Sequence, residues 1–398
     1  MTQYAQFGTH RPKRASENVA LLDTTLREGE QARGIQFNRD QKLAIAQAID
    51  GIGIDYLEVG HPAAAPAIAA DARAIARQNL RAQTVAHARA IEADVEAAAA
   101  AEVDWVGIFF SVTDAAMEAR FRRDEAACTA LIVRAIETAK AHGLRVRYTP
   151  EDTVRADPAV VARVAAAAVA AGADRIALAD TTGCMTPDGM AARVQALASA
   201  PGVHVPLHAH CHNDLGLATA NALAAFDAGA QVADVSVLGL GERAGITDLA
   251  QLATALTTQG IVAPERYHLA RLPALYDLVA EAAGIAIPAW APLVGRNAFS
   301  HNAGLHVSAV LVDPAFYESV PAHLVGRDRH IVIDRLSGQA AVAHRLTRLG
   351  REATREEVTL VLDVVKARGL NDIDDATLET LHDTVRMARA PAAPEVMT

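Results

Sequence analysis

Cysteine is scarce in this sequence. The chain has three, Cys128, Cys184 and Cys211, which are too few and too widely spaced for a disulfide framework. A reducing compartment is therefore expected. Long hydrophobic runs are also lacking: residues 1–17 are polar, and no stretch reaches the roughly 18 apolar residues of a membrane span. We expect a cytoplasmic protein with no signal peptide and no membrane partner.

Positive charge is limited as well. Lys and Arg number 37 against 47 Asp and Glu, which gives a net charge of −10. Such a balance argues against nucleic acid as a partner, because nucleic-acid-binding domains are usually basic. An anionic ligand would have to be held by a local cluster of Arg and His rather than by the field of the whole molecule.

From residue 19 to residue 258, short β-type runs alternate with longer alanine-rich helical runs. The predicted strands are 19–23, 56–59, 82–86, 105–110, 144–148, 175–179, 203–208 and 232–237. The predicted helices are 40–51, 66–78, 91–101, 125–142, 158–171, 187–198, 217–228 and 248–258. Prolines near helix starts and glycines just past helix ends support these boundaries. About eight strand–helix units predict an α/β fold, a (β/α)8 TIM barrel.

A doubly wound open sheet is the alternative fold. It would normally carry a glycine-rich nucleotide turn after the first strand. The sequence there is Asp23-Thr-Thr-Leu-Arg-Glu-Gly-Glu30, which is not such a turn. The barrel is therefore favoured.

Past Gly260 the regular alternation ends, which predicts a C-terminal helical appendage. Helices are expected at 270–283, 339–349, 355–368 and 376–389. The predicted domains are a polar N-terminal tail (1–18), the barrel (19–260), an interrupted subdomain (261–350), and C-terminal helices with a tail (351–398). Because the subdomain is small and broken by prolines, we expect it to lack a robust core and to pack on another surface.

The first predicted strand runs directly into charge. The apolar residues of this strand are followed by Arg27 and Glu28. Parallel α/β folds present their chemistry at the carboxyl ends of strands, so this pair is a candidate site. The alternative is a surface turn with solvated charges.

Three histidines near the seventh predicted strand supply partners for Glu28. Alternate residues of a strand share a face, so His210 and His212 would both point into the barrel mouth, with His208 deeper. Two imidazoles and a carboxylate from another strand form a facial metal-ligand set that leaves sites open for water and substrate. Mixed N and O ligands suit Mg²⁺, Mn²⁺, Co²⁺ or Zn²⁺, and the sequence does not choose among them.

Four motifs in order resemble the homocitrate synthase/2-isopropylmalate synthase family of TIM-barrel metalloenzymes. They are Leu22-Asp-Thr-Thr-Leu-Arg-Glu-Gly-Glu-Gln31, His210-Cys-His-Asn-Asp-Leu-Gly216, Gly239-Leu-Gly-Glu-Arg-Ala-Gly-Ile-Thr247 and His301-Asn-Ala-Gly-Leu-His306. The resemblance implies condensation of acetyl-CoA with a 2-oxo acid. It also implies Glu28, His210 and His212 as metal ligands.

The resemblance assigns further roles. It implies Arg27 as the cation beside the reacting carbonyl, and Glu151 and His306 as acid/base partners for the acetyl group. It places Thr181 on the substrate carboxylate, where the alternative is an ordinary turn at a helix start. A homodimer is implied too, with 261–350 acting as a lid and dimerisation subdomain.

His87, Arg147 and Thr149 indicate which 2-oxo acid is accepted. They lie near the ends of two neighbouring predicted strands. A buried arginine without an anion is costly, so these groups predict a carboxylate-bearing acceptor. Homocitrate synthases carry similar residues there, which favours 2-oxoglutarate and lysine biosynthesis. The alternative is that Arg147 pairs with Glu151 or Asp152 in a structural network.

Other interpretations remain open. Within the family they are 2-isopropylmalate synthesis, citramalate synthesis, or use of a phosphonate-bearing oxo acid. Outside it they are a hydroxymethylglutaryl-CoA-type lyase, which is typically a shorter chain, and a catalytically dead binding protein. The chain is also expected to lack a C-terminal leucine-regulated domain. His61 is expected to cap a strand end, and His330 is the best match to an appendage tyrosine that reaches a neighbouring site in some relatives.

Overall fold

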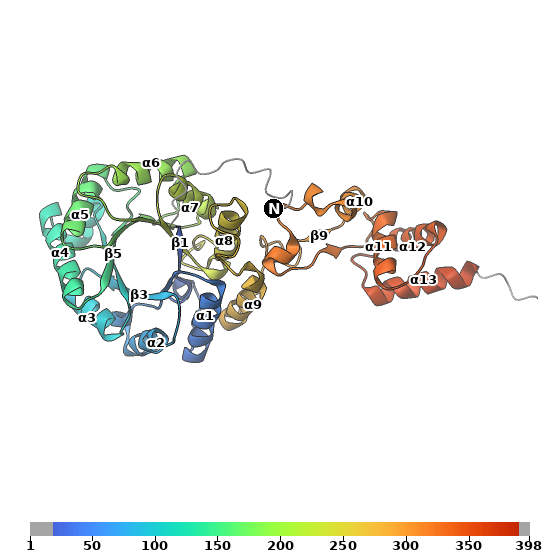
Figure 1. Cartoon of the computed structure of the whole chain (residues 1–398), viewed down its shortest axis with the longest axis horizontal. Helices are drawn as coiled ribbons and strands as arrows, with labels where there is room; N and C mark the ends of the chain where they lie inside the picture. Colours follow the sequence, from blue (N-terminus) through green and yellow to red (C-terminus); the bar gives the residue numbers. More distant parts are fainter. Residues whose placement is uncertain (1–18, 390–398) are drawn as a thin grey trace, which may run out of the picture. The chain divides into compact units, whose positions relative to one another are not determined.

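A closed barrel of eight parallel strands forms the larger part of the protein (Figure 1). The computed structural model describes residues 19–389, so the predicted tails at 1–18 and 390–398 lie outside the described residues. The strands follow each other around the barrel in chain order, and β1 pairs with β8 to close it. They are β1 Ala20–Asp23, β2 Tyr56–Glu58, β3 Gln83–Arg89, β4 Trp105–Ser111, β5 Arg145–Glu151, β6 Arg175–Asp180, β7 Leu207–Cys211 and β8 Val232–Val235. The predicted TIM-barrel fold is confirmed.

Eight helices surround the strands, as Figure 1 shows. They are α1 Arg39–Ile52, α2 Pro66–Ala76, α3 Glu92–Ala100, α4 Glu125–Ala141, α5 Pro158–Ala170, α6 Pro187–Ala198, α7 Ala218–Asp227 and α8 Leu249–Thr258. Proline opens α2, α5 and α6, where its missing N–H costs nothing. Asn38 closes a capping box at the start of α1, and Asp248 caps α8. These residues explain where α1, α2, α5, α6 and α8 begin.

Two strands differ from the prediction because of proline. β7 begins at Leu207 rather than at residue 203, since Pro206 has no N–H to donate to a ladder. β5 continues through Pro150 to Glu151, where its pairing is with β4. As a result His210 lies within β7, and Thr149 and Glu151 lie within β5. β3 likewise extends to Arg89 and so includes His87.

The chain divides into two compact units, and the division falls between residues 287 and 288. Helix α9, Leu272–Ala283, therefore belongs with the barrel and not with the subdomain predicted to begin at 261. Its Tyr276 hydroxyl accepts from Ala250 N at 2.7 Å and donates to Asp248 at 3.0 Å, which ties α9 to the start of α8. The barrel domain is thus longer than the sequence pattern indicated.

The second unit contains two short paired strands and four helices. They are β9 Ser300–His301, α10 Gly304–Val312, β10 His330–Ile331, α11 Gln339–Arg348, α12 Arg355–Ala367 and α13 Asp375–Arg389. One buried cluster spans Val307, Ile333, Leu346, Val361 and Leu378. This contradicts the expectation of a segment without a robust core, and it joins 288–350 to 351–389 in one unit. Three helices with regularly spaced apolar residues each contribute side chains to this one core. The shared core stabilises the unit, which no single segment could do alone.

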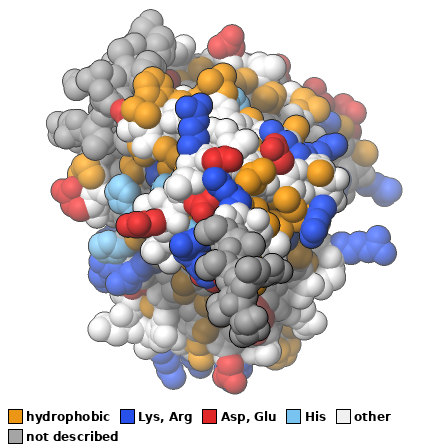
Figure 2. Space-filling model, turned by 90° about the vertical axis from the view of Figure 1, so that its right-hand side faces the viewer, with side chains coloured by type: hydrophobic (Ala, Val, Ile, Leu, Met, Phe, Trp, Pro, Cys, Tyr) orange, Lys and Arg blue, Asp and Glu red, His pale blue; other side chains and the backbone are white. Residues whose placement is uncertain are grey.

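Short turns of helix complete the described chain. They are Gly29–Gln31, Pro62–Ala64, Val237–Gly239, Leu269–Arg271, Pro314–Phe316, Ala322–Val325 and a π-helix at Ala116–Phe121. Within residues 19–389 no helix combines the length and the apolar character needed to cross a membrane. On the face drawn in Figure 2, acidic and basic side chains are interspersed rather than separated by sign.

Candidate active site

The turn after β1 holds Arg27 and Glu28 at the carboxyl end of the barrel strands. The Glu28 amide donates to Thr24 O at 2.8 Å, which closes the turn. The Glu28 carboxylate accepts the Glu242 amide at 3.2 Å. A Cβ at Gly241 would lie 3.0 Å from Glu28 Cγ, so glycine is what lets this loop approach the carboxylate. The motif at residues 22–31 and the motif at residues 239–247 are therefore in direct contact.

The histidines of β7 point into the barrel as the strand periodicity predicted. His208 is fully buried, and its Nε2 lies 2.7 Å from Asp234 Oδ1. His210 Nδ1 lies 2.7 Å from Asp234 Oδ2. His212 follows the strand and forms an isolated bridge with Ile246. One β8 carboxylate, Asp234, therefore orients two of the three imidazoles.

Glu28, His210 and His212 meet as a ligand set. One ligand atom from each lies within 4.8 Å of the others. Because Nδ1–H of His210 donates to Asp234, its Nε2 carries a free lone pair, and that atom faces His212 Nε2 at 3.2 Å. Burial, and after it the nearby His210, lower the pKa of His212 to about 4, so the imidazole of His212 is neutral near pH 7. Two imidazoles and a carboxylate fit a divalent cation.

Glu58, at the end of β2, lies at the centre of the adjoining charge network. It is fully buried, accepts from Arg27 Nε at 2.7 Å and Arg147 Nη2 at 3.0 Å, and lies 3.2 Å from His87 Nδ1. Although burial opposes it, pairing with Arg27 and then Arg147 holds the pKa of Glu58 well below its usual range. Burial, followed by repulsion from Arg27, lowers the pKa of His87 to about 4. His87 is therefore a neutral donor in this network.

Arg147 is buried and paired on two sides. Besides Glu58, it donates to Asp234 at 3.2 Å through Nη1, while its Nε is buried with no partner in the described chain. A Cβ at Gly107 would lie 2.8 Å from Arg147 Nη2, so glycine makes room for the guanidinium. The alternative pairing with Glu151 or Asp152 is wrong, because those acids bind Arg120 and Arg155 instead. Arg147 nevertheless belongs to a structural network.

The remaining predicted barrel residues lie on neighbouring strands. Thr149 and Glu151 share one face of β5 with Arg147. Glu151 is 29% exposed at its side chain and accepts from Arg120 at 3.0 Å. Thr181 follows β6, and its hydroxyl accepts the Asp152 amide at 2.9 Å. This last bond links the turn after β6 to the turn after β5, whereas the start of α6 is capped by Thr186.

Two other histidines have defined neighbours. His61 Nε2 lies 3.0 Å from Asp94 Oδ2, and its ring is edge-on to His87 with centroids 6.0 Å apart. His330 Nε2 lies 3.2 Å from Asp372 in the second unit.

His306 belongs to the second unit and not to the barrel. Its ring stacks on Tyr317, with centroids 4.1 Å apart and planes at 29°. The next residue, Glu318, accepts from Arg329 and lies 3.0 Å from His301 Nε2, which fixes this corner of the unit.

Three residues beside the candidate site residues were not predicted from the sequence: Glu58, Asp234 and Tyr317. The first two had a readable signal, since each is an acid within or ending an apolar strand, where an unpaired charge is costly. Tyr317 had none, because its stacking on His306 depends on how α10 and the following turn fold.

Comparison with known proteins agrees with this geometry. A family model described as HMGL-like matches residues 18–279, and one described as homocitrate synthase post-HMGL domain-like matches 293–372. A homocitrate synthase of Pyrococcus horikoshii is 45% identical over 347 residues, covering 87% of this chain and 94% of the relative. One from Sulfolobus acidocaldarius is 39% identical, covering 96% and 82%.

A solved structure of an HMG-CoA lyase from Brucella melitensis matches with a TM-score of 0.59 at 24% identity. The match covers 68% of this chain and 100% of the lyase. At that identity the likeness shows the fold alone. The HMGL-like family model, which matches residues 18–279, assigns the barrel to that class.

Within that class, the relatives narrow the assignment. The chain belongs to the homocitrate synthase family. The resemblance drawn from the four sequence motifs is thereby confirmed.

Proposed function

We propose that this protein condenses acetyl-CoA with 2-oxoglutarate to give homocitrate and CoA. The observation that carries the proposal is the convergence of Glu28, His210 and His212 beside the Arg27–Glu58–Arg147 network, in a chain of the homocitrate synthase family. The cytoplasm is the proposed compartment, and lysine biosynthesis the proposed pathway.

Glu28, His210 and His212 would hold a divalent cation, for which Mg²⁺, Mn²⁺, Co²⁺ and Zn²⁺ are the candidates. Such an ion supplies Lewis-acid polarisation of the 2-oxo group and a fixed orientation for the acceptor. Asp234 bonds Nδ1 of His210 at 2.7 Å, which orients the imidazole and leaves Nε2 as the atom that would bind the cation.

Arg27 is the proposed stabiliser of the negative charge that develops on the ketone oxygen. Although burial works against it, ion pairs with Glu58 and Glu28 raise the pKa of Arg27, so it stays cationic. Its side chain is fixed by Nε bonding to Glu58 at 2.7 Å, and an oriented donor of this kind needs little reorganisation during reaction.

Glu151 and His306 are the proposed acid/base partners. One removes a proton from the acetyl methyl group, and the resulting enolate carbon attacks the ketone carbon of the acceptor. The new C–C bond converts the ketone oxygen to an alkoxide, which takes a proton to become a hydroxyl. Water then hydrolyses the thioester and releases the CoA thiol, which makes the overall reaction effectively irreversible.

The acceptor is chosen by the groups that would meet its far carboxylate. Arg147 Nε is buried without a partner in residues 19–389, and His87 and Thr149 add neutral donors nearby. A carboxylate satisfies such donors, whereas the methyl groups of 2-oxoisovalerate would leave them unpaired.

The test is incubation of the purified protein with acetyl-CoA, a divalent ion and a panel of 2-oxo acids, followed by release of free thiol. We expect 2-oxoglutarate to give the highest kcat/KM, ahead of 2-oxoisovalerate, pyruvate and a phosphonate-bearing oxo acid. Preference for 2-oxoisovalerate would favour isopropylmalate synthesis, and preference for pyruvate would favour citramalate synthesis. If none of the 2-oxo acids in the panel gave thiol release, the proposal would be refuted. Cleavage of hydroxymethylglutaryl-CoA instead of condensation would also refute it.

A further inference from the structure

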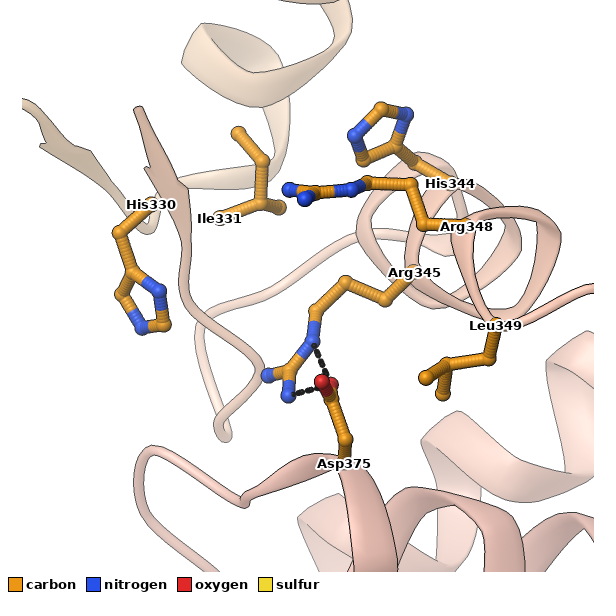
Figure 3. Close-up of a pocket in the computed structure, with 7 residues that line it drawn as sticks. All are labelled: His330, Ile331, His344, Arg345, Arg348, Leu349 and Asp375. Carbon is orange, nitrogen blue, oxygen red and sulfur yellow. Dashed lines mark hydrogen bonds and ion pairs between the residues drawn. The ribbon is translucent and has the colours of Figure 1, made fainter. Parts of the chain in front are cut away.

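A cavity of about 170 Å³ lies within the second unit, between β10, α11 and the start of α13 (Figure 3). We term it the α11 pocket, and its lining includes His330, Ile331, His344, Arg345, Arg348 and Asp375. Four of these six side chains are basic types. None of them belongs to the candidate active site of the barrel.

Arg345 gives the pocket a buried cationic wall. The residue is 9% exposed, and it donates through Nε to Asp375 at 3.0 Å and through Nη1 to Ile373 O at 2.7 Å, with a further Nη2 bond to Asp375. A guanidinium has five N–H donors, so two remain beyond these three contacts. Because the guanidinium of Arg345 is buried, its two remaining N–H groups favour the binding of a further hydrogen-bond acceptor.

Arg348 contributes a second cation. Figure 3 shows its guanidinium extending across the cavity between Ile331 and His344, one helical turn from Arg345 on α11. Arg348 is exposed, and the one acid of the lining, Asp375, pairs with Arg345 and has a side chain that is 58% exposed and so keeps much of its hydration. The pocket therefore carries an excess of positive charge.

His344 adds a neutral donor. Burial, followed by repulsion from Arg348 and Arg329, lowers the pKa of His344. Its imidazole is thus neutral near pH 7 and presents one ring N–H. Together the cations and the imidazole form a donor set that matches an oxyanion rather than a cation or an apolar group.

The volume limits the ligand. Drug-sized ligands occupy about 300–1,000 Å³, so this pocket suits a much smaller molecule and excludes CoA or a nucleotide. We propose that the α11 pocket binds a small oxyanion, either phosphate or a short carboxylate, gripped by Arg348 and the free N–H groups of Arg345. A purely structural ion pair with Asp375 would account for the position of Arg345. It would not account for Arg348 and His344, which line the same cavity.

Binding would tie β10 and α11 together across the unit that carries His306. The buried cluster of this unit contains Ile331 of β10, Leu346 of α11 and Val307 of α10. A ligand that binds only the folded form raises stability in proportion to its occupancy, so the anion is expected to stabilise this unit.

The test is calorimetric titration of the full-length protein with sodium phosphate and, separately, with sodium malonate, at constant ionic strength. We expect a saturable one-site isotherm for at least one anion, and the tighter one identifies the ligand class. Arg348→Gln should weaken that binding at least tenfold, whereas Arg355→Gln, which removes an exposed arginine of the same unit outside the pocket, should leave it within about twofold. Circular dichroism confirms that both variants are folded.

A barrel variant separates this site from the active site. His212→Ala should keep the anion affinity of the wild type. Absence of saturable binding, equal losses in Arg348→Gln and Arg355→Gln, or binding that is lost in His212→Ala but kept in Arg348→Gln would each overturn the proposal. Because no turnover is measured, failure of the condensation assay would not affect this result.

Discussion

Arg147 has an observed structural role and is also the proposed selector of the acceptor. Its guanidinium joins Glu58 of β2 to Asp234 of β8, so its removal would leave Glu58 with Arg27 alone and Asp234 with its two histidines, at a cost of roughly 3–5 kcal/mol. Arg147→Ala would therefore test stability as much as substrate choice. Lysine keeps the charge but loses the planar fork, which makes it the sharper substitution.

We predict that Arg147→Lys raises the KM for 2-oxoglutarate at least tenfold and changes the KM for acetyl-CoA less than twofold, since of the two substrates only 2-oxoglutarate has a far carboxylate for the guanidinium to bind. Steady-state kinetics with each substrate varied in turn measures both values. The matched control is Arg175→Lys, a buried barrel arginine that donates to the Tyr56 hydroxyl at 2.9 Å. Equal changes in the two variants, or an unchanged 2-oxoglutarate KM, would show that Arg147 does not select the acceptor.

The second prediction concerns the metal ligands. A chelator should abolish condensation, and a divalent ion should restore it. His212→Ala should weaken ion affinity by about a hundredfold or more, because it removes a direct ligand rather than a supporting group. Competition with a chromophoric chelator measures that affinity without reference to activity.

His204→Ala, at an exposed position, is the control and should bind the ion as the wild type does. Thermal unfolding should show both variants folded. Full activity in the chelated protein would rule out the metal-dependent reaction, and unchanged affinity in His212→Ala would rule out this ligand set.

At the scale of elements, the link between α8 and α9 contains a buried acid. Asp248 caps α8 by accepting the Gln251 amide at 2.9 Å, and Tyr276 of α9 donates to its other oxygen. Burial raises the pKa of Asp248 to about 6. An unfolded aspartate titrates near pH 3.9, so between about pH 4 and pH 6 unfolding releases a proton, and the stability contributed by this group falls as pH rises.

Asp248→Asn should remove that pH dependence while keeping the cap, because asparagine caps helices about as well as aspartate. The difference in unfolding free energy, variant minus wild type, should increase from pH 4 to about pH 6 and then level off. Urea unfolding at a series of pH values measures it. Asp157→Asn, which changes the exposed cap of α5, is the control. A flat difference for Asp248→Asn would contradict the assignment.

The elements themselves could largely be predicted from the sequence, whereas the contacts that assemble the site could not. Alternating short and long apolar runs predicted all eight strands, and alternate positions on β7 correctly placed His208 below His210. The start of β7 was misplaced because Pro206 was not given its full weight. Glu58 and Asp234 were missed because their partners come from strands distant in sequence, and only closure of the barrel brings those strands together.

At the scale of the whole molecule, the barrel contains the ligand set and the acceptor network, while His306 and Tyr317 belong to a unit with its own core. That unit exposes several large apolar side chains: Trp290, Leu305, Val312 and Phe316 are each at least 65% exposed. Such exposure favours a further interface. We therefore retain the prediction of a homodimer formed through this unit, and we propose in addition that one subunit's His306 serves the other's barrel.

Mixing two inactive variants tests this arrangement. His212→Ala destroys the ligand set, and His306→Ala removes the acid/base partner. If sites are shared between subunits, a mixed dimer contains one intact barrel served by one intact His306, so co-expression should restore roughly a quarter of wild-type activity for random pairing. Light scattering should give twice the chain mass of 41.8 kDa.

The control combines His212→Ala with Glu28→Gln. Both changes fall in the barrel ligand set, so every barrel in a mixed dimer is defective, and no activity should return under either arrangement. Recovery in the first mixture but not in the second would establish shared sites. No recovery in either, with a dimeric mass, would mean that each chain completes its own site. A monomeric mass with full wild-type activity would refute the dimer itself, and the exposed apolar side chains of the second unit would then need a different partner.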